Sequence, residues 1–286
     1  MNETGYQAKA PDPIPLKQEA FTNTGDTATY WLTGAGILIN SHGTTIMVDP
    51  ILSLVSQDPP LSEVEGTPQY VMPPIDAQSV PRLDAVLYTH ADEDHMGPVT
   101  VGILAKKGFI FHGTEWSGKR LAELGVPEQQ IVTHAPLSGF DIGCITVQMT
   151  AANHPWQLDY PERHLRVYKP EDCCGYKFYT PDGVVWHPGD SKFLPEHLDN
   201  TDVDLLYMDF ENNSPAHHFG TEAALKIVNH LCRAEVIMFH WGTYYAPEKC
   251  WYAADPEMVR GRIENPDRWL EPHPGEKVTV HRINSK

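Results

Sequence analysis

The amino-acid sequence predicts a fold of the α/β (α+β) class, in which mixed sheets carry helices on their outer faces. Strand-like segments near the N-terminus follow one another across short turns, whereas later strand-like segments alternate with helical patterns. The 286 residues contain no linker and no internal repeat of fixed period. We therefore expect a single domain over residues 28–286, preceded by a loose leader segment over residues 1–27.

The N-terminal strands are expected to form an antiparallel meander, because short turns at Gly34, Gly36 and Asn40-Ser41-His42-Gly43 separate apolar or alternating runs. The runs are Thr29–Thr33, Ile37–Asn40 and Thr45–Asp49. Residues 53–81 are rich in proline and acidic residues, which predicts a long loop before the next strand.

Strands and helices alternate from residue 83 onward. Pro98 suits the first turn of a helix, Gly125 suits the residue after one, and Pro181-Asp182-Gly183 suits a hairpin turn. The expected strands are Leu83–Thr89, Phe109–His112, Ile145–Ala151, Tyr176–Thr180, Val184–His187, Leu205–Asp209, Val236–Phe239 and Val278–Arg282. The expected helices are Pro98–Lys107, Thr114–Leu124, Thr221–Leu231 and Pro256–Ile263.

The composition argues against several classes of protein. A formal net charge of −17 disfavours nucleic acid or an anionic membrane as a partner, because phosphate contacts need a basic face. The sequence has no run of about 18 apolar residues to span a membrane, and its polar N-terminus lacks the apolar region of a secretory signal. The five cysteines form no CxxC pair, which fits a reduced compartment, so we predict a cytoplasmic protein.

The most informative segment is Thr89-His90-Ala91-Asp92-Glu93-Asp94-His95-Met96-Gly97, which directly follows an apolar strand. Further ligand-type side chains follow three other expected strands. Because α/β proteins place ligands at the C-terminal ends of strands, these side chains are expected to converge on a metal site. The candidate ligands are His90, Asp92, Asp94, His95, His154, Asp190 and His240.

The order and spacing of these ligands resemble the metallo-β-lactamase superfamily, whose hallmark is T-H-x-H-x-D-H-x-G followed by single His, Asp and His ligands. The resemblance extends over residues 28–283 and is strongest to the L-ascorbate-6-phosphate lactonase-like metal-dependent hydrolases. Its supporting segments are Tyr30–Ile37, Gly175–Gly183 and His187–Ser191. The resemblance implies an αββα sandwich of two mixed sheets flanked by helices, and metal-dependent hydrolysis.

The resemblance also implies a role for each ligand. One metal ion would be bound by His90 and His154, a second by Asp94, His95 and His240, and both by a bridging Asp190. Asp94 would also orient the water, and Asp49 would support a ligand histidine from behind. The expected cofactor is one or two divalent ions, with Zn favoured and Mn or Fe as alternatives, which lower the pKa of bound water to about 7.

Asp92 departs from the family, which has a histidine at this position. Three interpretations stay open: Asp92 is a carboxylate ligand, it points away and leaves one metal position weak, or the chain is a degraded relative. As a ligand, Asp92 would neutralise the charge left by two divalent ions, a hydroxide and two aspartates, and would favour harder ions such as Mn or Fe. The superfamily's flavodiiron proteins carry Glu here, so a di-iron oxidase or oxygenase is the alternative function.

A basic and aromatic segment precedes the strand at residue 176. It predicts a lid that grips a carboxylate or phosphate through Arg163, Arg166 and Tyr168, with a solvated surface loop as the alternative. His218 is a candidate proton donor to the leaving group. His187 is a candidate proton-transfer residue, with packing as the alternative.

We therefore expect metal-held hydroxide to attack an ester, lactone, amide or phosphoester bond of a small substrate, which the basic lid predicts to be anionic. Besides the oxidase, an RNA-processing nuclease and a metal-binding protein without catalysis are open, and the net charge of −17 disfavours the nuclease. The sequence also allows a homo-oligomer. Metal analysis with an optical spectrum would separate the hydrolase from the di-iron oxidase.

Overall fold

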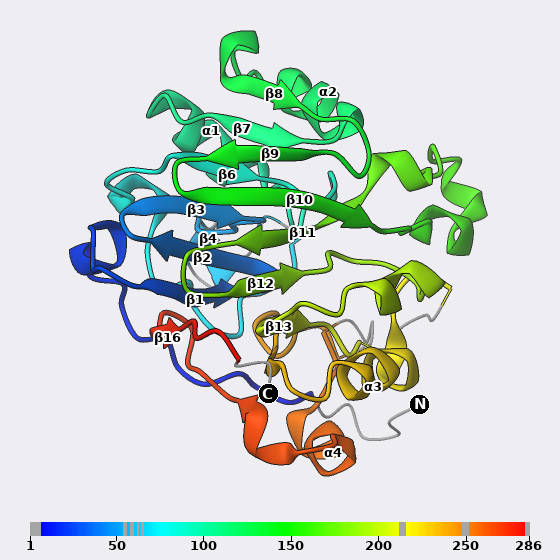
Figure 1. Cartoon of the computed structure of the whole chain (residues 1–286). Helices are drawn as coiled ribbons and strands as arrows, with labels where there is room; N and C mark the ends of the chain where they lie inside the picture. The colour runs from blue at the N-terminus through cyan, green and yellow to red at the C-terminus, as the bar shows by residue number, and fades with distance from the viewer. Residues whose placement is uncertain are drawn as a thin grey trace.

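The computed structural model describes residues 7–53, 56–57, 60–61, 63, 66–211, 216–247 and 252–283. Within these residues, two sheets of seven strands pack face to face (Figure 1). The first sheet contains, in spatial order, β16 (Val278–Thr279), β1 (Thr27–Thr33), β2 (Gly36–Ser41), β3 (Thr44–Val48), β6 (Ala85–Leu87), β7 (Phe111–Gly113) and β8 (Ile131–Thr133). The second contains β15 (Trp269–Leu270), β14 (Glu235–Met238), β13 (Leu205–Met208), β12 (Val184–His187), β11 (Cys174–Tyr179), β10 (Ile145–Ala151) and β9 (Gly139–Ile142).

Both sheets are mixed in the same way, which confirms the predicted α/β sandwich. In the first sheet, β16, β1, β2 and β3 pair antiparallel, whereas β3, β6, β7 and β8 pair parallel. In the second sheet, β9 to β12 pair antiparallel and β12 to β15 pair parallel. The C-terminal ends of β10, β12, β13 and β14 therefore meet at one edge of the second sheet, where side chains can converge.

Alternation along the strands divides the apolar residues between two clusters. In β2, Ile37 and Ile39 face the second sheet and join the cluster between the sheets, whereas Leu38 faces outward. The outer cluster of the first sheet includes Val101 and Leu104, which come from the helix that covers it. The first sheet thus buries both faces.

The helices lie on the outer faces of the sandwich (Figure 1). α1 (Pro98–Lys106) and α2 (Glu115–Glu123) cover the first sheet, and α3 (Gly220–His230) packs against the second. α4 (Pro256–Val259) is shorter than the expected helix over residues 256–263, and a 3₁₀ turn at Arg260–Arg262 follows it. The glycine at position 261 disfavours continued α-helix there. No helix in the described part of the chain combines the length and apolar character of a membrane span.

The start of α1 is capped from the distant loop between β3 and β6. The Glu63 carboxylate accepts the backbone N–H groups of Val99 (2.9 Å) and Thr100 (3.0 Å), as well as the Thr100 hydroxyl (2.6 Å). These donors have no partner inside a helix, because they lie in its first turn. The long loop expected over residues 53–81 contains a small two-stranded sheet, β4 (Ser56–Gln57) and β5 (Pro60–Leu61), and a 3₁₀ turn at Ala77–Ser79.

The segment expected to be a loose leader, residues 1–27, is packed where it is described. Ala8, Ala10 and Phe21 are buried, and the Ala10 N–H donates to the Gly242 carbonyl at 2.9 Å. The Leu16 N–H donates in the same way to a carbonyl of the loop before β6. These contacts fix the segment, so the expectation of a loose chain is corrected. Residues 1–6 lie outside the described residues, and the domain boundary at residue 28 stays a prediction.

Candidate metal centre

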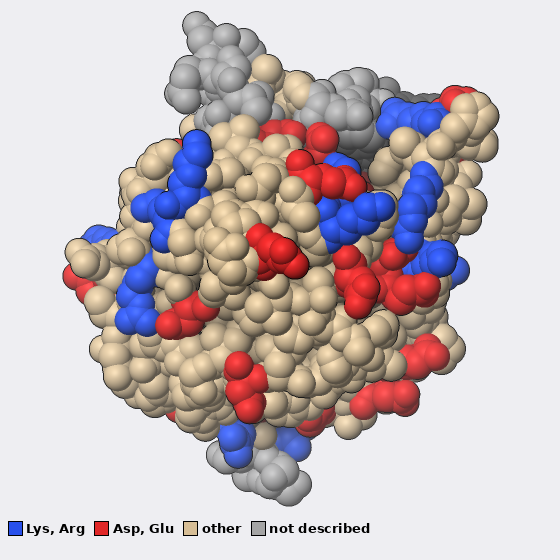
Figure 2. Space-filling model, turned by 90° about the horizontal axis from the view of Figure 1, so that it is seen from above, with Lys and Arg blue, Asp and Glu red and all other residues tan. Residues whose placement is uncertain are grey.

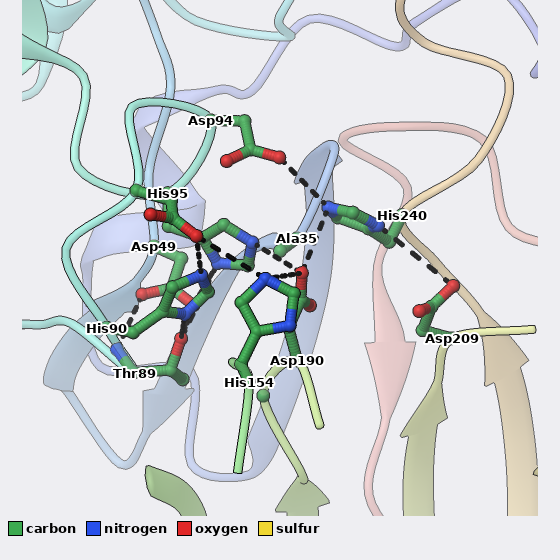
Figure 3. A network of polar contacts seen from close by, with 12 residues as sticks. Ala35, Asp49, Thr89, His90, Asp94, His95, His154, Asp190, Asp209 and His240 are labelled. Carbon is green, nitrogen blue, oxygen red and sulfur yellow. Dashed lines mark hydrogen bonds and ion pairs between the residues drawn. The ribbon is translucent and has the colours of Figure 1, made fainter. Parts of the chain in front are cut away.

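Loops that follow β6, β10, β12 and β14 bring the predicted ligands together (Figure 3). Asp190 lies in the middle: its Oδ2 is 3.2 Å from His95 Nε2 and 3.8 Å from His240 Nε2. Within the described residues, four groups of three side chains offer ligand atoms that lie within 4.8 Å of one another. Two consist of predicted ligands, namely His90, His154 and Asp190, and Asp94, His95 and His240; the other two are Asp190, Asp209 and His218, and Asp209, Glu211 and His240. Asp190 therefore occupies the position that a bridging carboxylate needs.

Two residues just beyond strand ends adopt the left-handed backbone conformation. Asp49, after β3, has φ 45°, and His240, two residues after β14, has φ 60°. Such a conformation costs of order 1–3 kcal/mol for a non-glycine residue. Hydrogen bonds from the Asp49 N–H to the Leu87 carbonyl and from the His240 N–H to the Gly34 carbonyl, both 2.9 Å, hold the two turns. At Asp49 and His240, the backbone therefore turns away from the direction of the preceding strand, next to the proposed metal centre.

Asp49 is a fully buried carboxylate that organises two of the histidines. It accepts the backbone N–H (2.8 Å) and hydroxyl (2.5 Å) of Thr89, and Nδ1–H of His95 (2.8 Å). Because the Thr89 hydroxyl donates to Asp49, its oxygen accepts from Nδ1–H of His90 at 3.0 Å. Both imidazoles are thereby fixed with Nδ1 protonated and with the lone pair of Nε2 available to a metal ion.

The other two histidines are held from behind in a similar way. His154 donates Nδ1–H to the backbone carbonyl of His217 at 2.8 Å, which again leaves Nε2 unprotonated. His240 Nδ1 lies 4.0 Å from Oδ1 of the buried Asp209 (Figure 3). It also faces a second buried carboxylate, with Glu211 Oε2 at 3.5 Å. All four imidazoles are therefore oriented by partners on the side away from the centre.

Several buried polar atoms of the centre lack a hydrogen-bond partner among the described residues, namely His90 Nε2, Asp190 Oδ1 and both ring nitrogens of His240, whose Nδ1 faces Glu211 at an ion-pair distance of 3.5 Å. An unsatisfied buried group costs about 1–3 kcal/mol. Burial acts to raise the pKa of Asp190, but the neighbouring His240 and His95 hold it well below its usual range. Burial also acts to raise the pKa of Asp94, but His95 and His240 lower it to about 2. Unpaired imidazole nitrogens beside ionised carboxylates fit divalent metal ions, which take this ligand set.

Asp92 also faces this centre. Its Oδ2 lies 3.1 Å from His90 Nε2 and 3.4 Å from His154 Nε2, and its Oδ1 accepts the Tyr168 hydroxyl at 2.7 Å. Of the three interpretations that the sequence left open, this position fits the carboxylate ligand and not a side chain that points away. Tyr168, expected to contact substrate, lines the cavity above the centre and also orients Asp92.

A cavity of about 650 Å³ opens above the centre, and two of the three arginines in its wall, Arg163 and Arg166, differ in their surroundings. Arg166 is paired with Asp172 at 2.8 and 3.0 Å and lies 3.9 Å from the ring centre of Trp116. Arg163 lies 4.7 Å from the ring centre of Tyr160 and has no carboxylate partner within the described residues. The predicted anion-binding role therefore fits Arg163, whereas the charge of Arg166 is already neutralised.

The two histidines expected to move protons lie in different places. His218 lines the cavity, and its Nδ1 lies 3.0 Å from Asp209 Oδ2. Burial acts to lower the pKa of His218, but Glu211 and Asp209 raise it to about 9. His187 lies outside the cavity: its Nε2 donates to the Ala35 carbonyl (2.8 Å) and its Nδ1 accepts the Gly189 N–H (3.2 Å). Both ring nitrogens are engaged by backbone, so the expected proton-transfer role is corrected to a packing role.

Sequence reasoning missed three residues of the centre: Asp209, Glu211 and Tyr252. Asp209 and Glu211 follow β13 as His240 follows β14, so the rule that located the ligands at strand ends could have found them. Tyr252 donates its hydroxyl to Asp94 Oδ2 at 3.0 Å. It does not follow a strand, so no sequence signal marked it.

The comparisons with known proteins agree with this geometry. The beta-lactamase superfamily domain matches residues 44–241, a range that contains all the predicted ligands. A UPF0173 metal-dependent hydrolase from Pyrobaculum aerophilum is 28% identical over 241 residues, which cover 82% of this chain and 90% of that protein.

Two solved structures share the fold. The isothiocyanate hydrolase from Delia radicum gut bacteria has a TM-score of 0.69 at 17% identity, covering 89% of this chain and 99% of that one. A diiron β-hydroxylase from Streptomyces venezuelae has a TM-score of 0.61 at 16% identity, covering 95% of this chain and 55% of that one. Because the family match spans more than half of the sequence, the chain belongs to the beta-lactamase superfamily domain family.

Proposed function

We infer that this protein is a metal-dependent hydrolase of the beta-lactamase fold, and we propose that its centre holds one or two divalent ions. The observation that carries the proposal is the set of unpaired imidazole and carboxylate atoms that converge at the strand ends, each oriented from behind. Zn is favoured by the four imidazoles, with Mn or Fe as alternatives because of the carboxylates. When bound, such an ion lowers the pKa of a water molecule and stabilises negative charge on the attacked group.

The residues around the ions have separable tasks in this proposal. Asp92, Asp94, Asp190 and the four histidines bind the ions, and Asp94 also orients the attacking water. His218 is anchored on Asp209 through Nδ1, so its Nε2 is the nitrogen that delivers a proton to the leaving group. Tyr252 and Tyr168 donate to Asp94 and Asp92, and so hold these carboxylates in place.

We propose a small molecule with an ester, lactone, amide or phosphoester bond as substrate, and Arg163 as the residue that attracts an anionic group on it. The lactonase-like subfamily that the sequence resembles favours an ester or lactone. The face in Figure 2 carries Lys and Arg interspersed with Asp and Glu, a mixed pattern that does not favour a polyanion such as nucleic acid. A cytoplasmic location and a homo-oligomer stay predictions.

The test is a hydrolase assay on protein freed of metal with a chelator and then supplied separately with Zn²⁺, Mn²⁺ or Fe²⁺. Aryl esters, lactones, anilides and aryl phosphates serve as the panel. We expect hydrolysis of at least one class only after metal is restored. An apoprotein as active as the restored protein, or silence of the whole panel at full metal occupancy, would contradict the proposal.

A di-iron oxidase or oxygenase is the second candidate, and Asp92 is the observation that favours it. Its carboxylate lies beside His90 and His154, and an oxygen ligand there favours harder, more readily oxidised ions. Metal analysis of protein purified without added metal, together with its optical spectrum, separates the two functions. Iron with near-ultraviolet absorption and oxygen uptake would support the oxidase, whereas Zn or Mn would support the hydrolase.

A further inference from the structure

The two halves of the centre differ in what holds their histidines. We name His90, Asp92 and His154 the outer half-site, and Asp94, His95 and His240 the inner half-site. The outer histidines donate to neutral oxygens, the Thr89 hydroxyl (3.0 Å) and a backbone carbonyl (2.8 Å). The inner histidines face carboxylates, Asp49 (2.8 Å) behind one ring and Glu211 (3.5 Å) behind the other. The halves therefore have unequal electrostatic surroundings.

Glu211 is the unusual member of this arrangement. Its side chain is 2% exposed, and Asp209 beside it is fully buried. Asp209 has two donors, the Glu211 N–H (2.8 Å) and His218 (3.0 Å), whereas the carboxylate of Glu211 has His240 Nδ1 as its nearest charged partner. Removing a carboxylate from water is expensive unless a positive group faces it. The protein thus buries Glu211 where it interacts with the ring of His240.

A carboxylate behind an imidazole changes the imidazole as a ligand. It fixes the tautomer with Nδ1 protonated, and it draws that proton outward, which makes Nε2 more basic than a carbonyl or hydroxyl acceptor would. Its charge also attracts a cation at Nε2, and this attraction is strengthened where water is excluded. The inner half-site has Asp49, Asp209 and Glu211 behind it, whereas the lone carboxylate of the outer half-site, Asp92, already accepts from Tyr168.

We propose that Glu211 is a positioning residue for His240, and that it makes the inner half-site the tighter metal position, which fills first while the outer half-site exchanges its ion. This inference rests on the proposed metal centre. It goes further because it says which metal position has the higher affinity, and because it attributes the difference to Glu211, a residue that is not itself a ligand.

The experiment is a calorimetric titration of chelator-treated full-length protein with Zn²⁺. We expect wild type to bind in two steps whose dissociation constants differ by more than ~10-fold, because loss of a partner behind a ligand typically changes metal affinity by about 10–100-fold. Glu211→Gln should weaken the tight step by about 10–100-fold and leave the weak step unchanged. Glu211→Asp keeps the charge and should restore part of the loss. Glu222→Gln, on an 82% exposed side chain, is the matched control.

A second variant keeps the test decisive if Glu211→Gln does not fold. Asp92→Asn changes the outer half-site, so it should lower the affinity of the weaker binding step and leave the tighter step unchanged. This pattern is the opposite of that expected for Glu211→Gln. Equal effects of Glu211→Gln on both steps, or none on either, would overturn the inference. So would a third bound ion that Glu211→Gln removes, because Glu211 would then be a ligand itself. A wild-type protein that binds no Zn²⁺ would instead refute the proposed metal centre.

Discussion

The metal centre and the wall of the cavity above it are built in different ways. The ligands follow strands of the two sheets, and their histidines are buried, three of them hydrogen-bonded from behind and His240 facing carboxylates there. The wall includes the short 3₁₀ turns Trp156–Asp159 and Pro161–Arg163, the exposed Leu165, and Trp116 and Arg120 of α2. The difference indicates that the chemistry is fixed by the sandwich, whereas recognition depends on turns held by a few side chains.

The largest loss of activity and metal content is expected from Asp190→Asn, in the metal centre. The amide cannot bridge two cations, so this loss should exceed the about 10–100-fold effect of losing a partner behind a ligand. We expect more than ~100-fold lower activity and lower metal content by elemental analysis. Asp141→Asn, on the surface strand β9, should behave as wild type. Full metal content and activity in Asp190→Asn would contradict the bridging position.

A smaller effect in the same region is expected from Thr89→Val. Valine has a similar shape, but it removes the hydroxyl that joins Asp49 to His90. We expect metal affinity to fall about 10–100-fold. The apoprotein should also lose about 1–3 kcal/mol of unfolding free energy, because the buried Asp49 and His90 each lose a hydrogen bond. Thr146→Val, which removes an exposed hydroxyl contact to Asp141, is the control. Unchanged metal affinity would mean that the hydroxyl does not orient the ring.

The roles given to the cavity wall are tested by comparing substitutions of Arg163 and Arg166. Arg163→Ala should raise KM for an anionic substrate about 10-fold, because a hydrogen bond to a charged group contributes about 1.5–3 kcal/mol, and should leave KM for a neutral analogue unchanged. Arg166→Ala should instead lower the thermal stability, because it leaves the buried Asp172 without its partner. Steady-state kinetics and thermal unfolding measure both. The reverse pattern would exchange the roles that we give to Arg163 and Arg166.

The last expected effect concerns the stability of the fold in acid and does not involve a predicted ligand. Burial lowers the pKa of His197 to about 4, although its bond to the Ala151 carbonyl acts in the opposite direction. In the unfolded chain the pKa is about 6.5, so the unfolded state binds a proton first as the pH falls. Stability is therefore complete above about pH 6.5 and decreases down to about pH 4, by at most about 1.4 kcal/mol per pH unit. The difference in unfolding free energy between wild type and His197→Gln should follow this window; a pH-independent difference would contradict it.

The strands predicted most accurately are those whose apolar pattern and flanking turn residues lie next to each other in the sequence. β10 and β12 have the expected bounds, because apolar residues recur along them and Pro181-Asp182-Gly183 closes the hairpin after β11. β8, β9 and β15 were missed. Two of them are short and largely solvent-facing, and β15 has two residues, so none carries a run of apolar residues long enough to notice. Only the assembled sheet stabilises them.

The same distinction holds for the centre. His90, Asp94 and Asp190 could be located because ligand-type residues at strand ends have few other uses. The anion-binding role of Arg166 stays a prediction, but its pairing with Asp172 was missed, because a basic composition does not reveal which acid neutralises which arginine. The strand-end rule could have marked Glu211 as a residue of the centre, but its place behind His240 follows from the pairing of β13 with β14, which the sequence does not show.

The cap that Glu63 places on α1 explains the last residue of the ligand motif. Gly97 has φ −63°, a conformation open to any residue, so its backbone does not require glycine. Space does: a Cβ at this position would overlap the Glu63 carboxylate and come within 2.7 Å of the Ile51 side chain. A larger residue would expel the cap and displace the loop that carries Asp94 and His95. If this protein is redesigned, a substitution at Gly97 should therefore be combined with a substitution at Glu63.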